Sequence, residues 1–399
     1  MKEKNKKIMT PLKNIFKAKA SIFFLLITTG AAFSQGTTTA PVTTTVNEGR
    51  TPTPALPFLL IATDARSAAM GDAGVATATD VNAIFWNPAR LAVADKSGGI
   101  TASFTPWLRA LVDDMSLLNI AGYKQFGNYA FGLSINYFNQ GEFTATDAIG
   151  TEIGKYKSNE YAIAGSGSMK LSDKSSLGLN IKYLVSDLTG GLTGSASPTL
   201  VAQTAAADIS YFFNMKRDKK WNYTFGAMIS NIGGKVSYGD KGNNFLPTNL
   251  KLGMAGIRML DTRNKLTLTA DINKLMTPTP PKKDASGKII AGGYNPDKDN
   301  SALGVAFSSF GDAPDGFSEE LKEFTLSLGA EYLYNNMFAI RAGYHDESEQ
   351  KGNRKYFTTG LGLKYQEDLS IDLGYMIPVA GKQSPLANTG RISLAYHFE

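Results

Sequence analysis

The sequence predicts an all-β protein: a 14-stranded antiparallel transmembrane β-barrel with an N-terminal helical hatch in its lumen. Three observations lead to this fold class. Apolar side chains recur at every second position in fourteen segments, which is the period of a β-strand. The connections between those segments alternate between longer and shorter ones. No run of 18 apolar residues follows the leader, so strands are the predicted membrane-crossing elements.

The strand period is clear in residues 265–272. Leu268 and Ile272 belong to one alternate row, and Thr267 and Asp271 belong to the other. The first row suits lipid and the second suits a crowded polar interior. The fourteen predicted strands are 100–106, 117–125, 129–139, 160–171, 175–188, 203–213, 223–232, 248–259, 265–275, 324–334, 337–346, 356–365, 370–379 and 391–398.

The connections support the same fold. Long ones, of which 276–323 is the longest, alternate along the chain with short turns such as 126–128 and 335–336. Long extracellular loops opposite short periplasmic turns are typical of outer-membrane barrels. Because lipid cannot satisfy unpaired backbone groups, the last strand must pair with the first. That last strand ends in an apolar alternate row, formed by Ile392, Leu394, Tyr396 and Phe398.

Residues 1–34 have the pattern of a cleaved signal peptide. Basic residues precede a short apolar run at 22–27 and small residues that end at Ser34. The leader holds seven Lys and one Glu, so the 41 basic and 35 acidic residues of the chain fall to 34 of each after cleavage. The formal charge of +6 therefore does not indicate a nucleic-acid partner. We expect export to the cell outer membrane.

The residue types restrict the chemistry that the chain can perform. Cysteine is absent, and His345 and His397 are the only histidines. The usual hydrolase, metalloprotease and nucleotide-binding motifs do not occur after the leader. The sequence therefore predicts no catalytic residues, no metal site and no cofactor, and a protein that is not an enzyme.

Two segments separate the leader from the barrel at 96–399. Residues 35–57 are rich in Thr, Pro and Gly, and we expect them to be a flexible periplasmic lead-in. Residues 58–95 are Ala-rich and compatible with helices, and we expect them to fold into the lumen as a hatch or plug. Four charged residues of the hatch could pair with the barrel wall: Asp64, Arg66, Asp72 and Asp80.

The hatch sequence resembles a known family. Residues 70–76 (MGDAGVA), Asp80 and residues 86–92 (WNPARLA) resemble the N-terminal hatch of FadL-like barrels. The resemblance is greatest to the PorV/PorQ family of the Bacteroidetes type IX secretion system, and it extends to residues 316–332 and to the strand count. It implies a FadL-like barrel that works in protein export.

The same resemblance implies partners. Family members bind a large translocon barrel and capture secreted proteins that carry a conserved C-terminal sorting domain. They deliver these substrates to a surface attachment complex that contains a sortase-like peptidase. Outer-membrane lipid would surround the barrel. The alternative function is a FadL-like transporter of hydrophobic small molecules, which needs an apolar path from the loops to the hatch.

Two interpretations of the hatch motif stay open. In the structural one, which we favour, Gly71, Gly74 and Pro88 set backbone geometry, while Asn87 and the aspartates satisfy buried polar groups. In the other, the hatch gates a hydrophobic path, as it does in FadL-like transporters.

Loops carry the candidate partner contacts. These are Trp107 and Leu108 in the first loop, Leu192 at a glycine-rich tip, and Phe310 and Phe317 in the connection 276–323. The tip could be a finger that enters a partner barrel, or it could be inert. The two phenylalanines could be exposed for protein contact, or a short helix at 318–323 could turn them inward.

Overall fold

The computed structural model describes residues 50–399, apart from 148, 189, 191–200, 217–220, 240–243, 285, 287, 294–300, 367 and 382–383. These residues belong to one compact unit, Glu48–Glu399. The predicted signal peptide and residues 35–49 of the predicted lead-in lie outside the described residues. No helix among the described residues combines the length and apolar character needed to cross a membrane.

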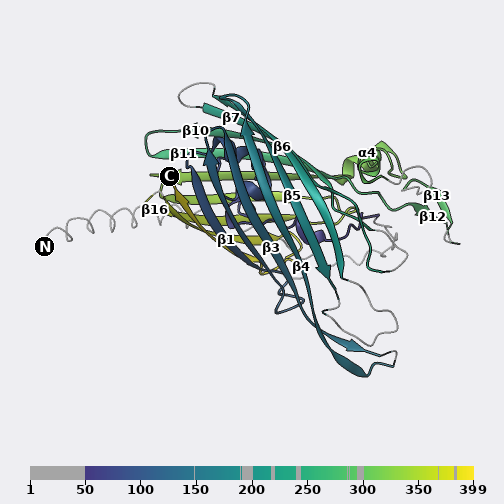
Figure 1. Cartoon of the computed structure of the whole chain (residues 1–399). Coiled ribbons are helices and arrows are strands. Elements are labelled where there is room, and N and C mark those ends of the chain that lie inside the picture. The colour runs from purple at the N-terminus through teal and green to yellow at the C-terminus, as the bar shows by residue number, and fades with distance from the viewer. Residues whose placement is uncertain are drawn as a thin grey trace, which may run out of the picture. The chain divides into compact units, whose positions relative to one another are not determined.

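Fourteen strands form a closed antiparallel barrel, which confirms the predicted fold class (Figure 1). The first and last strands pair and close it, with Ile100 opposite Tyr396. The barrel strands are β1 (Gly98–Pro106), β2 (Ser116–Phe126), β3 (Tyr129–Thr146), β4 (Glu152–Lys170), β5 (Ser175–Asp187), β6 (Ala202–Lys216), β7 (Trp221–Gly233), β10 (Asn249–Met259), β11 (Asn264–Leu275), β14 (Phe324–Tyr334), β15 (Phe338–Asp346), β16 (Tyr356–Tyr365), β17 (Leu369–Pro378) and β18 (Gly390–Phe398).

The two faces of the strands follow the predicted alternation. On β11, Leu268 and Ile272 are about half exposed on the outside, whereas Thr267 and Asp271 are buried in the lumen. Outward rows of this kind contain most of the exposed large apolar side chains. The barrel thus has an apolar outer surface and a filled polar interior.

Strands β3 and β4 are longer than the sequence period predicts. Their pairing continues beyond an irregularity between Asn139 and Glu142 and runs on to Thr146. The Phe143 and Tyr156 rings stack across the extension at 5.6 Å. Figure 1 shows this hairpin projecting past the neighbouring strands. The extension lacks a clear alternation, so it was visible only through its cross-strand pairing.

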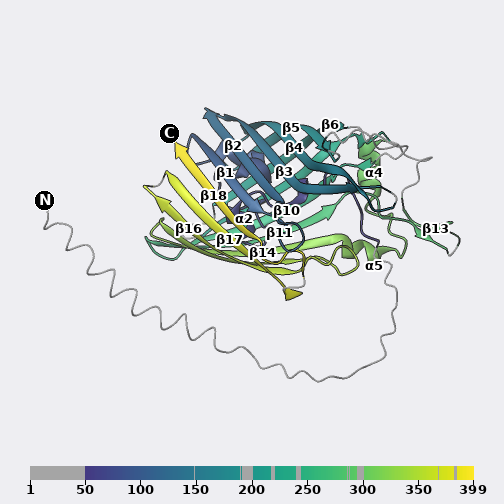
Figure 2. The same cartoon turned by 90° about the horizontal axis from the view of Figure 1, so that it is seen from below.

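The connection 276–323 has secondary structure of its own. It contains a small hairpin, β12 (Lys282–Lys283) with β13 (Ile289–Ala291), followed by α4 (Ala302–Ser308), α5 (Phe317–Glu320) and the 3-10 turn η3 (Leu321–Glu323). A second hairpin, β8 (Lys235–Val236) with β9 (Asn244–Phe245), lies between β7 and β10. Figure 2 shows α4, α5 and β13 at the opposite end of the barrel from the C-terminus.

Inside the barrel, residues 58–95 form short helices joined by irregular backbone, and we call this segment the plug (Figures 1 and 2). Its helical turns are η1 (Pro57–Leu60), α2 (Ala65–Ala68), α3 (Ala83–Trp86) and η2 (Pro88–Val93). Most of the plug is buried, including Ala65, Met70 and Leu91, each fully excluded from solvent.

Residues 50–57, which we call the lead segment, lie at the end of the barrel that carries the long connections. The Ala55 N–H donates to the Phe245 carbonyl oxygen at 2.8 Å, and Arg50 pairs with acidic residues of the connection 276–323. The lead-in predicted at 35–57 is described only from residue 50 onward, and its periplasmic position stays a prediction. A composition poor in apolar residues indicates little burial, but it does not say at which end a segment enters a barrel.

Candidate functional site

Capping and turn residues set the local structure of the plug. Asp64 caps α2 by accepting a hydrogen bond from the Ser67 N–H at 2.8 Å, and its second oxygen accepts one from Trp86 Nε1 at 2.6 Å. Pro88 begins η2, where its missing N–H has no partner to lose. The Asn87 amide donates to backbone carbonyls of the plug and of Tyr211 on β6, at 3.0 and 3.1 Å. Asp64 therefore bonds within the plug, and Asn87 bonds both the plug and the wall.

Glycines allow the plug backbone to touch the wall. Gly71 has a φ of 72°, and a Cβ there would lie 2.6 Å from the carbonyl oxygens of Leu328 and Tyr344. On the wall, a Cβ at Gly343 would overlap the Gly71 nitrogen. Seven further strands present glycines whose Cβ would meet plug atoms: Gly132, Gly178, Gly226, Gly253, Gly329, Gly360 and Gly374.

Single carboxylates hold the next part of the plug. One oxygen of Asp271 on β11 accepts hydrogen bonds from the N–H groups of Gly74 and the residue after it, at 2.7 and 2.9 Å. A Cβ at Gly74 would overlap the ring of Trp86, so the glycine is needed for close packing rather than for a special φ. Asp72 accepts a 2.5 Å hydrogen bond from the Tyr356 hydroxyl of β16.

A buried ion network joins the plug to three wall strands. Arg66 donates to both oxygens of Glu331 on β14 at 2.9 and 3.0 Å, and to Asp80 at 2.7 Å. Arg341 on β15 bonds Glu331 and Asp372 on β17, each at 2.7 Å. All these side chains are at most 18 % exposed, so their charges must be paired. The predicted pairing of Arg66 and Asp80 with the wall is thus direct for Arg66 and indirect for Asp80.

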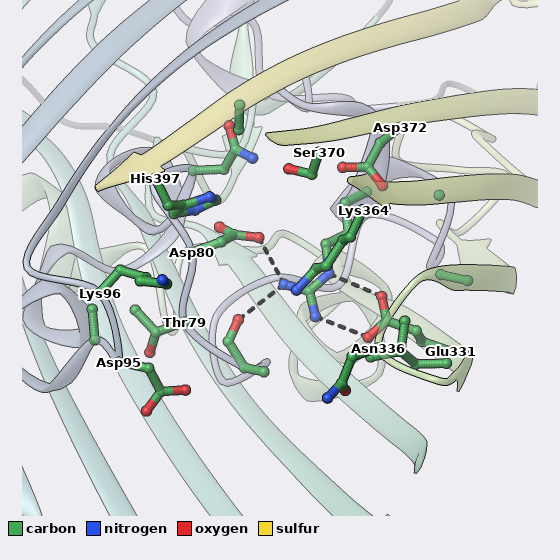
Figure 3. Close-up of a pocket in the computed structure, with 18 of the residues that line it drawn as sticks. Thr79, Asp80, Asp95, Lys96, Glu331, Asn336, Lys364, Ser370, Asp372 and His397 are labelled. Atoms are coloured by element: carbon green, nitrogen blue, oxygen red, sulfur yellow. Dashed lines mark hydrogen bonds and ion pairs between the residues drawn. The ribbon is translucent and has the colours of Figure 1, made fainter. Parts of the chain in front are cut away.

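A cavity of about 340 Å³ lies beside this network, at the end with the short turns (Figure 3). Asn336 of the β14–β15 turn lines it, together with Lys96, Lys364 and His397. Figure 3 shows these polar side chains converging from the plug and the wall. A cavity with so many charges does not suit an apolar ligand, because such a ligand would desolvate them without replacing their hydrogen bonds.

A second ion network lies at the end with the long connections. Arg50 donates to both oxygens of Glu319 on α5 at 3.1 Å, and it also pairs with Asp315. Lys351, between β15 and β16, donates to Glu319 and Glu323 at 2.8 Å each. We call this group the mouth network. It joins the lead segment to two long connections, which brings together three segments that are far apart in the sequence.

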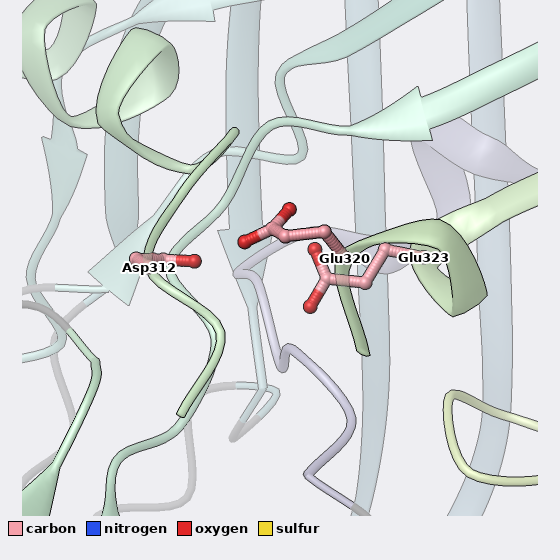
Figure 4. A group of neighbouring side chains, drawn as sticks. All are labelled: Asp312, Glu320 and Glu323. Atoms are coloured by element: carbon pink, nitrogen blue, oxygen red, sulfur yellow. The ribbon is translucent and has the colours of Figure 1, made fainter. Parts of the chain in front are cut away.

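Three carboxylates lie close together next to the mouth network, and one of them, Glu323, belongs to it. They are Asp312, Glu320 and Glu323 (Figure 4). The buried ammonium group of Lys274 pairs with Glu323 and lies 3.5 Å from Glu320. The Lys274 ammonium group therefore already neutralises part of the negative charge of these three carboxylates. Burial, together with the neighbouring Glu323 and Glu320 charges, raises the pKa of Asp312 to about 6.

The pKa of Glu319 moves the opposite way. Its burial acts to raise the pKa, but hydrogen bonds from Arg50 and Lys351 outweigh it and lower the pKa to about 2. Glu319 is therefore ionised at every physiological pH and holds both cations, whereas Asp312 titrates close to neutrality.

The two partner-contact candidates of the first loop, Trp107 and Leu108, are partly buried. Trp107 is half-buried against the apolar cluster that contains Leu56 and Phe58, and the Arg391 guanidinium lies 5.8 Å from its ring centre. Leu108 is also half-buried and has a φ of 48°. The third candidate, Leu192, lies outside the described residues.

The candidates in the connection 276–323 are exposed. The helix predicted at 318–323 is present as α5 and η3, yet it does not turn the phenylalanines inward, since Phe310 is 42 % and Phe317 is 76 % exposed. Other exposed apolar side chains accompany them. We call the five together the apolar set: Leu303, Phe307, Phe310, Phe317 and Leu321.

Sequence reasoning found the plug residues but missed their partners. Glu331, Arg341 and Asp271 are the wall charges that hold the plug, and Lys351 and Glu319 close the opposite end. A signal existed for the wall residues, because each is a charged residue in the strand row that alternates with the apolar one. No such signal marks the mouth network, whose members lie outside the barrel strands.

Comparison with known proteins agrees with this architecture. The P. putida toluene transporter TodX superposes with a TM-score of 0.50 at 13 % identity, over 84 % of this chain and 98 % of that one. The Ralstonia pickettii toluene transporter TbuX gives 0.49 at 14 % identity and a Pseudomonas aeruginosa FadL homologue gives 0.46 at 14 %, both over the same shares of the chains. At such identities the likeness to TodX shows the fold alone. No curated protein matches the chain.

A family model is more specific. The model described as "Type IX secretion system protein PorV" matches residues 44–282, which is more than half of the chain and includes the whole plug. With the closed 14-stranded barrel, this match identifies an outer-membrane β-barrel. The chain therefore belongs to the PorV family and is an outer-membrane component of the type IX secretion system.

Proposed function

We propose that the chain is a non-enzymatic adaptor that binds proteins through its extracellular loops. It binds the large translocon barrel and exported proteins that carry the C-terminal sorting domain. It then delivers these substrates to the surface attachment complex with its sortase-like peptidase. Membership of the PorV family supports the pathway, and the geometry of the barrel supports binding at the loops.

The observation that carries the proposal is that the barrel is filled. The plug meets the wall backbone at glycines of many strands, and its Arg66 pairs with Glu331. At the other end, the mouth network ties the lead segment to two connections. Passage of a polypeptide through such a lumen would require both networks to break, so surface binding is the simpler use of this barrel.

The apolar set supports the loops as the binding surface. Leu303 and Phe307 lie one turn apart on α4, and Phe317 and Leu321 lie one turn apart at α5 and η3, so each pair shares a helix face. Exposed aromatic and aliphatic side chains grouped on one loop are typical of protein contacts. The mouth network holds this connection in place, which lowers the entropic cost of binding.

Affinity purification from native membranes tests the proposal. Tagged wild-type protein is expected to recover a very large outer-membrane barrel and secreted proteins that share one C-terminal domain. A Phe307→Ser, Phe317→Ser variant should recover at least tenfold less of these partners while remaining folded in the membrane. Mass spectrometry of the eluates measures both.

A matched variant separates contact from general loop damage. Ile289 and Ile290 on β13 belong to the same connection and are 54 and 55 % exposed. Ile289→Ser with Ile290→Ser should leave recovery unchanged. Recovery of a lone barrel from the wild-type protein, with lipid as its only companion, would contradict the adaptor function.

The alternative function, transport of hydrophobic small molecules, has a weaker basis. The 340 Å³ cavity is lined by charged side chains from the plug and the wall, whereas an apolar substrate needs an apolar path. Extraction and analysis of lipids from the purified barrel would favour transport if one hydrophobic compound were bound in stoichiometric amount.

A further inference from the structure

The outer wall of the barrel has two grooves that join each other. The first has a volume of about 470 Å³ and extends from β17 across β18, β1 and β2 to β3. The second has a volume of about 910 Å³ and extends from β18 to β5. They join at Ile100, Gly122 and Leu133, which line both. We call them the outer grooves, and they lie on the apolar surface that the membrane covers.

Glycines in the outward strand rows form the floor of the outer grooves. In the barrel register, Gly122 on β2 lies between Ile100 on β1 and Leu133 on β3. Gly165 on β4 lies between Leu133 and Ile181 on β5. Leu133 is 70 % exposed and Ile181 is 63 % exposed, so both stand as ridges beside the glycines. A Cβ at Gly165 would have no atom within 4 Å, so this floor is open to an occupant.

One charged side chain lines the outer grooves among the described residues, and it is Lys124. It belongs to the outward row of β2, close to the short turn at 127–128. Its ammonium group donates to the Ser97 hydroxyl at 2.7 Å and lies 5.3 Å from the centre of the Phe398 ring. No carboxylate of the described residues lies within ion-pair distance of it. An ammonium group has three donors, so two of them are open to a ligand.

These features select a lipid with a negatively charged group in its head. Glycines and apolar side chains suit hydrocarbon chains, because the chains gain close contact and desolvate no polar group. The short turns of such barrels face the periplasm, so Lys124 lies at the boundary between that membrane leaflet and water. Tyr129, half exposed at the start of β3, is typical of the same boundary. A lipid phosphate there supplies the counter-charge that Lys124 lacks.

The shape of the outer grooves suits two chains that share one head. Phe131 and Leu133 form a ridge on β3, 56 % and 70 % exposed, which separates the floor at Gly122 from the floor at Gly165. Lys124 is two positions from Gly122 in the same outward row. A lipid whose phosphate meets Lys124 can therefore place one chain on each side of the ridge. A detergent with a single chain would leave one side empty.

We propose that the outer grooves hold one glycerophospholipid of the periplasmic leaflet. Its phosphate binds Lys124, and its two acyl chains lie on either side of the Leu133 ridge. Bulk lipid touches the whole outer wall, whereas this molecule stays bound when the membrane is removed. The site is independent of the proposed adaptor function, because Lys124 lies near the C-terminal end of the barrel and the apolar set lies at the other (Figure 2).

Native mass spectrometry of the full barrel, purified in a mild detergent, tests the proposal. We expect one phospholipid to stay bound to each wild-type barrel. Lys124→Met removes the charge and Gly165→Leu fills one floor, so each should lower the bound fraction at least tenfold. Rebinding to the delipidated barrel separates head from chains. Dioleoyl phosphatidylglycerol and dioleoyl phosphatidylethanolamine should bind at least tenfold more tightly than dioleoylglycerol, which has the same chains and no phosphate.

The matched control is Arg258→Met. Arg258 is an exposed cation in the outward row of β10, close to a short turn, and it lies 5.1 Å from the centre of the Trp221 ring without lining the outer grooves. Its loss should leave the bound fraction at the wild-type value. Resistance to SDS without heating checks that each variant is a folded barrel.

Several outcomes would overturn the proposal. One is a wild-type barrel that retains no phospholipid, and another is an equal loss in Arg258→Met. Equal binding of dioleoylglycerol would remove the phosphate from the site. Release of a bound protein chain instead of lipid in Gly165→Leu would assign the outer grooves to a protein interface.

Discussion

Arg66 of the plug donates two hydrogen bonds of nearly equal length, 2.9 and 3.0 Å, to the two carboxylate oxygens of Glu331 on β14. The two residues are 265 positions apart in the sequence. This bidentate geometry is the strongest form of a charge-assisted hydrogen bond in proteins. Because Arg341 also bonds Glu331, one wall carboxylate holds both the plug and the neighbouring strand.

Replacing Glu331 by Gln should loosen the plug. The change leaves Arg66 and Arg341 facing each other without their shared carboxylate, and loss of one partner from a buried pair costs about 3–5 kcal/mol. We expect a lower free energy of unfolding in urea and ion conductance in planar bilayers. The control is Lys155→Gln, whose pair with Glu142 is exposed to solvent and therefore contributes little to stability. Equal effects of the two changes would show that the buried pair is not the anchor.

Replacing Gly343 by Ala should displace the plug from the wall. The new Cβ would overlap the Gly71 nitrogen, and neither backbone can retreat without breaking strand or plug hydrogen bonds. Trypsin should then cut within residues 58–95, which the wild-type barrel protects. The same substitution at Gly165 on β4 places a Cβ where no atom lies within 4 Å, so the barrel should remain resistant. Resistance of Gly343→Ala would mean that the contact is looser than the structure indicates.

Replacing Arg50 by Ala should release the lead segment from the long connection. Arg50 is 13 % exposed and bonds Glu319 and Asp315, whereas Lys282 pairs with the same Asp315 at the surface. Hydrogen exchange in residues 302–323 is expected to rise about tenfold in Arg50→Ala and to stay unchanged in Lys282→Ala. An equal rise in both variants would assign the effect to Asp315 alone.

Stability of the mouth network should fall as the pH rises through about 6. The pKa of Asp312 is raised to about 6, above its unfolded value, so its stabilising contribution is complete at low pH and is lost as the carboxyl ionises. Glu319, with a pKa of about 2, stays ionised and adds no slope between pH 5 and 7. Hydrogen exchange in 302–323 should therefore increase from pH 5 to 7 beyond the intrinsic rate change. Asp312→Asn should remove that excess, and an excess that persists in the variant would assign the titration to another group.

Much of the fold could be predicted from the sequence, because strand alternation is a local property. All fourteen strands were predicted within a few residues, except the outer halves of β3 and β4, where the alternation fades and only pairing extends the strands. The plug candidates Asp64, Arg66 and Asn87 were also predicted, but not the residues that bind them. The helix near 318–323 was predicted without the exposure of Phe317, since exposure depends on what else packs nearby.

The sequence by itself determined which residues form strands, which face of each strand is apolar, and that the chain closes as a barrel, because those properties follow from period and length. Only the tertiary structure decided that Arg66 meets Glu331, that the lead segment lies with the long connections, and that Lys351 meets Glu319. These are contacts between residues many positions apart. They exist only once barrel closure has set the register of every strand and has brought the plug against the wall.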